Sequence, residues 1–182
     1  MKVVNSKLPG VMIITPNIFK DVRGYFFESY RKSWFKENGI PYDFVQDNEV
    51  KSKKGVLRGL HYQLNQPQGK LIRVNSGSIL DVVVDIRKGS PYFGQSEVVE
   101  LDSNDCKMLY VPEGFAHGYL VTSDVAFVTY KCTKEYSPSD QYGIMWSDPF
   151  LDLNWGIDNP ILSKMDQKWP ILQQQINLPV YS

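Results

Sequence analysis

Ten short runs of apolar or alternating residues, separated by turn residues, most limit how this chain can fold. Valine, isoleucine, tyrosine and phenylalanine are frequent in them, and Gly, Pro, Asn, Asp or Ser bounds most of them. Such runs favour β-strands. The runs are 11–15, 25–30, 44–50, 56–63, 70–75, 79–86, 97–101, 108–111, 115–121 and 125–132. Many short strands at this spacing predict an all-β sandwich or barrel.

Helical patterns are scarce. Residues 32–38 predict a two-turn helix that Gly39 ends in a left-handed cap, and 163–168 predict a second helical piece before Trp169-Pro170. The stretch 171–182 is expected to dock on the body of the protein. At 182 residues the chain is too short for two well-filled domains, so we expect one domain over 1–182.

The charge balance excludes some partners. Twenty basic residues match twenty acidic ones, so no overall field draws the chain to nucleic acid or to an anionic membrane. The two cysteines, Cys106 and Cys132, are too few for a disulfide framework, which fits a reducing cytoplasm. We expect no signal peptide and no membrane span, because no run of eighteen apolar residues occurs.

Segment 55–63, Gly-Val-Leu-Arg-Gly-Leu-His-Tyr-Gln, places an arginine and a histidine inside an apolar strand pattern. Side chains alternate between the two faces of a strand, so Arg58 and His61 would point to opposite sides of a regular one. A bend or bulge at Gly59 would bring both to one face. The alternative is a regular edge strand with a solvated arginine and a hydrogen-bonded histidine. This segment alone does not distinguish the bulge from the edge strand.

The run 79–86 is almost continuously apolar, apart from Asp81 and Asp85. Both aspartates share one face of the expected strand with Val83. This mixed face is typical of a barrel whose lumen holds a ligand. The equal alternative is that the aspartates pair with nearby arginines.

The second of only two histidines, His117, lies between Gly114 and Gly118, and glycine lets a ligand or another backbone approach closely. A metal site in a barrel takes about three histidine or carboxylate ligands. Two histidines would need added carboxylates, so we expect no metal.

Further polar residues are candidates for ligand binding. Residues 46–48, Gln-Asp-Asn, could bind hydroxyls or phosphate oxygens, although the segment by itself favours a polar strand end. Arg23, Arg58 and Lys70 would bind a diphosphate if they converge, whereas each alone would be a surface charge. A tyrosine such as Tyr130 can serve as a general acid, although most tyrosines only pack.

Together these motifs resemble the nucleotide-sugar 3,5-epimerase family. The resemblance covers residues 10–166 and rests on nine ordered motifs, so chance assembly is negligible. The motifs are Asp-Val-Arg-Gly-Tyr-Phe-Phe-Glu (21–28), Phe-Val-Gln-Asp-Asn (44–48), 55–63, Gln-Gly-Lys-Leu (68–71), Asp-Val-Val-Val-Asp-Ile-Arg (81–87), Pro-Glu-Gly-Phe-Ala-His-Gly (112–118), Tyr-Lys-Cys-Thr (130–133), Gly-Ile-Met-Trp (143–146) and Leu-Ser-Lys-Met-Asp (162–166).

The resemblance implies a cupin-type β-barrel or jelly roll, a homodimer with strand exchange, and an active site inside the barrel that uses no metal or other cofactor. The implied substrate is a nucleotide-linked 4-keto-6-deoxyhexose. Its hydrogens at C3 and C5 are both alpha to the C4 carbonyl, so a base can remove either to give an enolate. Reprotonation on the opposite face inverts the centre. The leading hypothesis is therefore a 3,5-epimerase, an isomerase, on the route to dTDP-L-rhamnose.

The resemblance also implies roles for single residues. His61 would be the base and Asp166 the carboxylate that orients it, Lys70 would stabilise the enolate oxygen, and Tyr130 would be the acid on the other face. The residues implied in substrate binding are Gln46, Asn48, Arg58 and His117 for the sugar or diphosphate, Tyr136 for the nucleobase, Gln141, and Arg23 and Glu28, which a neighbouring subunit would supply.

Two positions depart from the family pattern. Met165 precedes Asp166 where the family often has lysine, and Gln141 stands where it often has glutamate. Both positions contact the ligand in relatives, so the chemistry is better defined than the substrate. The alternatives are an epimerase of one centre only, an epimerase of another nucleotide 4-keto sugar, a non-catalytic sugar-binding barrel, and a metal-dependent cupin.

Overall fold

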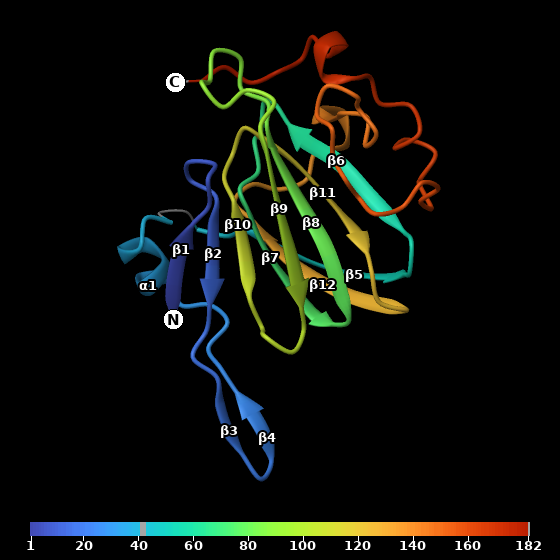
Figure 1. Ribbon diagram of the computed structural model, residues 1–182. Coiled ribbons are helices and arrows are strands. Elements are labelled where there is room, and N and C mark those ends of the chain that lie inside the picture. The colour runs from blue at the N-terminus through green and yellow to red at the C-terminus, as the bar shows by residue number, and fades with distance from the viewer. Residues whose placement is uncertain (41–42, 182) are drawn as a thin grey trace.

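Two antiparallel sheets face each other in the computed structural model, which describes residues 1–40 and 43–181 (Figure 1). The six-stranded sheet has the order β1 (Lys2–Asn5), β2 (Met12–Thr15), β10 (Met108–Val111), β7 (Lys70–Ser76), β12 (Val125–Cys132), β5 (Gln46–Lys53). The five-stranded sheet has the order β13 (Gln141–Gly143), β6 (Leu57–Gln63), β11 (Phe115–Val121), β8 (Ser78–Asp85), β9 (Ser96–Asp102). This architecture confirms the expected all-β, cupin-type jelly roll.

The remaining elements are short. Strands β3 (Phe19–Asp21) and β4 (Gly24–Phe26) form a hairpin that projects from the body (Figure 1). Helix α1 (Lys32–Glu37) is followed by Gly39, whose φ of +85° confirms the predicted left-handed cap. Two 3₁₀ turns, η1 (Pro138–Asp140) and η2 (Leu172–Gln174), complete the set. No helix in the described part of the chain is long and apolar enough to cross a membrane.

Each of the ten predicted runs overlaps a strand, but one run was wrong in part and the second predicted helix was wrong. The run 25–30 forms strand only as far as Phe26, because its partner β3 is three residues long and offers no further ladder. Residues 163–168 form a turn and no helix. There the Ser163 hydroxyl accepts a hydrogen bond from the Asp166 amide, which competes with helical pairing.

Strand β8 explains the almost continuous apolar run around Asp81 and Asp85, because it is buried on both faces. Val83 packs in the core between the sheets, whereas Val82 and Val84 pack in a second core on the outer face of the five-stranded sheet. Residues of the long C-terminal segment, such as Trp155, cover that outer face. A third core lies under α1 on the six-stranded sheet.

The C-terminal residues dock on the body, as expected for 171–181, while Ser182 lies outside the described residues. Leu172 and Leu178 enter the second core, and Val180 forms a parallel bridge with Lys88. The Arg87 guanidinium stacks between the rings of Phe115, at 4.3 Å, and Tyr181, at 4.8 Å. These contacts fix the tail beside the start of β11.

Gly59 forms the bulge that the sequence suggested. His117 of β11 pairs with His61, but Tyr119 pairs with Arg58, so β6 has one extra residue between the two pairs. Gly59 has a φ of +134°, and a Cβ there would lie 2.5 Å from the Cα of Gly118. Arg58 and His61 both line one cavity as a result, which confirms that they do not sit on opposite faces of a regular strand.

Gly59→Ala should destabilise the protein strongly, because both the backbone conformation and the contact with Gly118 exclude a side chain. We expect the free energy of unfolding to fall by about 3–5 kcal/mol in urea titrations. Gly89→Ala is the matched control, since Gly89 has a φ of +87° but open space around it. Its cost should stay near 1–2 kcal/mol, roughly that of the backbone alone. Equal losses in the two variants would contradict the role of the close contact.

Candidate active site

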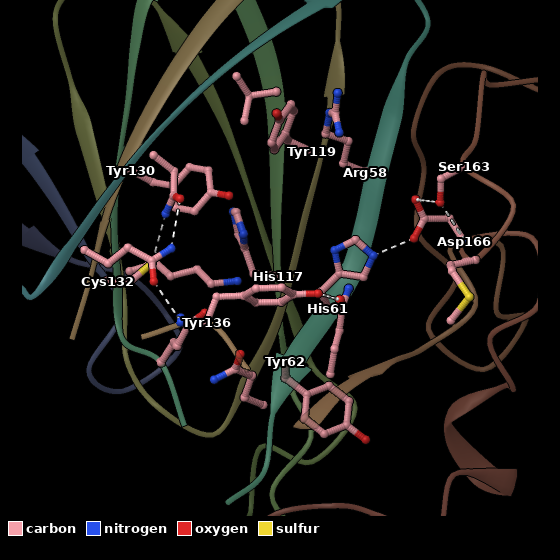
Figure 2. A pocket seen from close by; sticks show the side chains of 18 residues that line it. Arg58, His61, Tyr62, His117, Tyr119, Tyr130, Cys132, Tyr136, Ser163 and Asp166 are labelled. Carbon is pink, nitrogen blue, oxygen red and sulfur yellow. Dashed lines mark hydrogen bonds and ion pairs between the residues drawn. The ribbon is translucent and has the colours of Figure 1, made fainter. Parts of the chain in front are cut away.

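A cavity of about 450 Å³ lies between the two sheets and opens to solvent. It contains ten of the twelve residues selected from the sequence. These are Gln46, Asn48, Arg58, His61, Lys70, His117, Tyr130, Tyr136, Gln141 and Asp166. They come from β5, β6, β7, β11, β12 and β13 and from the loops at the cavity mouth. Figure 2 shows Arg58, His61, His117, Tyr130, Tyr136 and Asp166 among the side chains that line the cavity.

His61 forms a close pair with Asp166. The Nε2 atom of His61 lies 2.5 Å from Oδ1 of Asp166 (Figure 2). The hydroxyl of Ser163 donates to the other carboxylate oxygen at 2.8 Å, and the indole of Trp169 donates to Oδ1 at 3.2 Å. Burial alone would raise the pKa of Asp166, but the hydrogen bonds from His61, Ser163 and Trp169 outweigh it and lower that pKa.

The lowered pKa of Asp166 determines which ring nitrogen of His61 carries a proton. At neutral pH Asp166 is a carboxylate and can only accept hydrogen bonds, so Nε2 of His61 must carry a proton. In the neutral imidazole the other nitrogen, Nδ1, is then unprotonated. His61 lines the cavity, and its free nitrogen is therefore the atom available as a base.

The second histidine is held in the same manner. Nε2 of His117 lies 2.9 and 3.0 Å from the two carboxylate oxygens of Asp81, which is fully buried. Burial raises the pKa of Asp81, and His117 and Lys70 oppose that rise. Asp85 instead pairs with Arg87 at 2.6 Å. Each aspartate of β8 thus follows one of the two alternatives: Asp81 faces the cavity side, and Asp85 forms an arginine pair.

Tyr130 and Lys70 approach from the six-stranded sheet, opposite His61. Burial raises the pKa of Tyr130, so its hydroxyl stays protonated at neutral pH. Burial lowers the pKa of Lys70, while Cys132 and Asp81 oppose that change. Since β6 and β12 belong to different sheets, the histidine and the tyrosine face the cavity from different sides.

Polar residues at the mouth are fixed by one another. The Gln46 amide donates to Oδ1 of Asn48 at 2.9 Å, and its oxygen accepts from the Tyr136 backbone at 2.7 Å. The hydroxyl of Tyr136 donates to Gln141. Nε of Arg58 donates to the buried hydroxyl of Ser52 at 3.1 Å. These contacts hold donors and acceptors ready for a polar ligand.

Arg23 and Glu28 do not reach this cavity. Arg23 lies in the projecting hairpin and pairs with Asp21 at 2.5 Å, and Glu28 pairs with Arg31 at 3.3 Å. Among residues 1–40 and 43–181, no group of three or more His, Cys, Asp or Glu side chains is arranged to hold a metal ion.

Sequence reasoning missed several residues at the site. Ser163 and Trp169 hold Asp166, and Tyr119 and Cys132 line the cavity. The spacing of Ser163 and Asp166 is that of a Ser-x-x-Asp turn, which could have indicated their contact. Trp169 gave no such signal, because its contact with His61 depends on tertiary structure.

Comparisons with known proteins agree with this geometry. A family model described as dTDP-4-dehydrorhamnose 3,5-epimerase matches residues 5–174. The chain is 45% identical over 181 residues to the dTDP-4-dehydrorhamnose 3,5-epimerase of Methanothermobacter thermautotrophicus, covering 98% of this chain and 96% of that protein.

Solved structures are similar as well. The dTDP-6-deoxy-D-glucose-3,5-epimerase of Legionella pneumophila, in complex with dTDP-4-keto-L-rhamnose, superposes with a TM-score of 0.97 and 42% identity, covering 100% of this chain and 98% of that one. A 3'-monoepimerase from Streptomyces bikiniensis, in complex with dTDP-quinovose, gives a TM-score of 0.91 and 33% identity over 97% of this chain and 92% of that one.

Asp166→Asn should change how stability depends on pH. The native pKa of Asp166 lies below its ordinary value of 3.8, so the stability it contributes is complete above that value and is lost as pH falls through the lowered pKa. At pH 7 the variant should lose about 1–3 kcal/mol of unfolding free energy. Urea titrations between pH 7 and pH 2 should show the gap to wild type closing in acid. Asn at the exposed Asp124 is the control, and a gap that stays constant to pH 2 would contradict the prediction.

Proposed function

The chain belongs to the dTDP-4-dehydrorhamnose 3,5-epimerase family, and on that premise we propose that it inverts C3 and C5 of dTDP-4-dehydro-6-deoxy-D-glucose to give dTDP-4-dehydro-L-rhamnose. The observation that carries the proposal is the placement of His61 and Tyr130 on opposing sheets around one cavity. Inversion needs a base on one face of a carbon and an acid on the other. We infer that residues 1–182 form a single cupin-like epimerase domain.

His61 acts first in this mechanism. Its Nδ1 takes the proton from C3 or C5, and the electrons of the broken C–H bond move to the C4 oxygen as an enolate. Asp166 stabilises the imidazolium that forms and keeps the ring oriented. Lys70 is a preplaced cation for the charge that develops on the oxygen.

Tyr130 completes the inversion. Its hydroxyl donates a proton to the enolate carbon on the face opposite His61, the C4 carbonyl re-forms, and proton exchange with water resets both groups. Each inversion breaks and forms one C–H bond, so no electrons leave the sugar. The reaction therefore requires no redox cofactor, and Lys70 supplies the positive charge at the enolate oxygen.

The remaining cavity residues are proposed to bind the substrate. Gln46, Asn48, Arg58 and His117 contact the sugar and the diphosphate, with Ser52 orienting the guanidinium of Arg58. Tyr136, half exposed at the mouth, stacks on the nucleobase beside Gln141. The substrate class, a soluble nucleotide sugar, and the two free cysteines fit the cytoplasm.

A homodimer is part of the proposal. The β3–β4 hairpin exposes Phe19, Val22 and Phe26, and an isolated two-stranded hairpin is marginally stable in water. We place this hairpin against a second copy of the chain by strand exchange, where it delivers Arg23 and Glu28 to the neighbouring cavity.

A single-centre epimerase is the second candidate, because a 3'-monoepimerase shares the fold with a TM-score of 0.91. Met165 and Gln141, which depart from the family pattern, both line the cavity. An epimerase of another nucleotide 4-keto sugar is therefore a further alternative. A sugar-binding barrel without catalysis is the remaining alternative.

Deuterium uptake separates these functions. Wild-type protein incubated with dTDP-4-dehydro-6-deoxy-D-glucose in heavy water should label both C3 and C5, as read by NMR. His61→Asn should slow labelling by about 10³-fold, the scale of general base catalysis, while dTDP still raises the melting temperature. Label at C3 alone would support the single-centre enzyme. An absence of label in wild type would support a binding protein.

Phe26→Asp should weaken the dimer, because it places a charge in the apolar surface of the hairpin. Sedimentation should show a shift toward monomer, and kcat/KM should fall about tenfold or more as Arg23 and Glu28 are withdrawn. Ile176→Asp is the control, since Ile176 is an exposed apolar residue outside the hairpin. A variant that remains as dimeric as wild type would contradict this interface.

A further inference from the structure

Trp169 lies behind the His61–Asp166 pair and is not part of the cavity wall. Its indole Nε1 donates to Oδ1 of Asp166, the same oxygen that lies 2.5 Å from Nε2 of His61. The two rings also touch, with centroids 6.3 Å apart and planes at 72°. The indole therefore contacts both members of the pair without lining the cavity itself.

The absence of a side chain at Gly143 makes space for this indole. Gly143 of β13 pairs directly with His61 of β6. A Cβ on Gly143 would come within 2.5 Å of the Trp169 ring, so any other residue there would push the indole away. Pro170 extends the attachment, because its carbonyl accepts a hydrogen bond from the Met145 amide at 2.9 Å. Trp169 is thus held between β13 and the acid–base pair.

Ser163 and Trp169 both donate hydrogen bonds to the Asp166 carboxylate, but they connect it to different parts of the fold. Ser163 holds Oδ2 from within the same turn, at 2.8 Å, so it moves together with Asp166. Trp169 holds Oδ1 while its ring rests on β13, which belongs to the same sheet as His61. Apart from the His61–Asp166 bond itself, the indole is the one side chain among residues 1–40 and 43–181 whose hydrogen bond ties the Asp166 carboxylate to the sheet that carries the base.

We propose that Trp169 is a positioning residue, which fixes Asp166, and through it His61, so that the unprotonated Nδ1 faces the substrate. This role deepens the proposed epimerase function and rests on it. A tryptophan that only filled space would stabilise the fold without affecting the chemical step. The indole N–H and the ring contact therefore have separate consequences that substitutions can distinguish.

Trp169→Phe is the main test, because it keeps an aromatic ring against Gly143 but removes the N–H donor. We expect kcat to fall about tenfold with KM within about twofold of wild type, since the lost contact acts on the base and not on the ligand. Gly143→Ala displaces the indole without changing Trp169 and should give the same pattern.

Trp155→Phe is the matched control. Trp155 is buried, whereas Trp169 is partly buried, and Trp155 too donates its indole N–H, but to the backbone oxygen of Trp146 at 2.9 Å, away from the cavity. This variant should lower the melting temperature and leave kcat unchanged. If Trp169→Phe behaves like Trp155→Phe, or raises KM with kcat unchanged, the positioning role is wrong.

A spectroscopic reading keeps the test independent of activity. The chain has only two histidines, so ¹⁵N-histidine labelling reports His61 and His117 alone. In wild type the Nε2-bound proton of His61 should give a resolved signal, and in Trp169→Phe and Gly143→Ala that signal should broaden or move while His117 stays unchanged. An unchanged His61 signal in both variants would overturn the proposal.

If the wild type catalyses no epimerisation, the proposed function is wrong, but the His61 signal still shows whether Trp169 positions the His61–Asp166 pair. Should Trp169→Phe fail to fold, the kinetic measurement and the NMR measurement are both made on Gly143→Ala.

Discussion

The backbones of β6 and β11 meet at Gly59 and Gly118, and the rest of the site depends on this contact. Neither position has room for a side chain, because a Cβ on either would lie within 3 Å of the other strand. The extra residue accommodated there turns Arg58 and His61 toward the same cavity. Backbone geometry, which a change of rotamer cannot undo, therefore sets the direction of the base.

The interior between the sheets combines an apolar core and a polar cavity. At one end Ile72, Val74 and Val83 pack as in any β-sandwich. At the other, Asp81, His117 and Lys70 are charged or polar groups that share a confined space. Buried charges are tolerated when they are paired, and these groups offset one another. The apolar core supplies the stability that a polar cavity cannot.

The sequence predicts much of this fold because its patterns are local. Strands β10, β11 and β12 match their runs at both ends, since turn residues bound them. Strands β1, β3 and β13 were not predicted, because a run of three or four residues shows no clear alternation of apolar and polar side chains. The cavity residues follow from motif resemblance, whereas Trp169 depends on a partner strand that no periodicity reveals. The expected helix at 163–168 failed because the Ser163 hydroxyl competes for the backbone.

The order of the five-stranded sheet also has a consequence in time. Strand β6 sits between β11 and β13, so both of its neighbours lie more than fifty residues further along the chain. During synthesis on the ribosome, β6 emerges long before either partner and must wait with its apolar residues unpaired. Until β11 is synthesised, residues 57–63 are therefore open to a chaperone or to an aggregating neighbour.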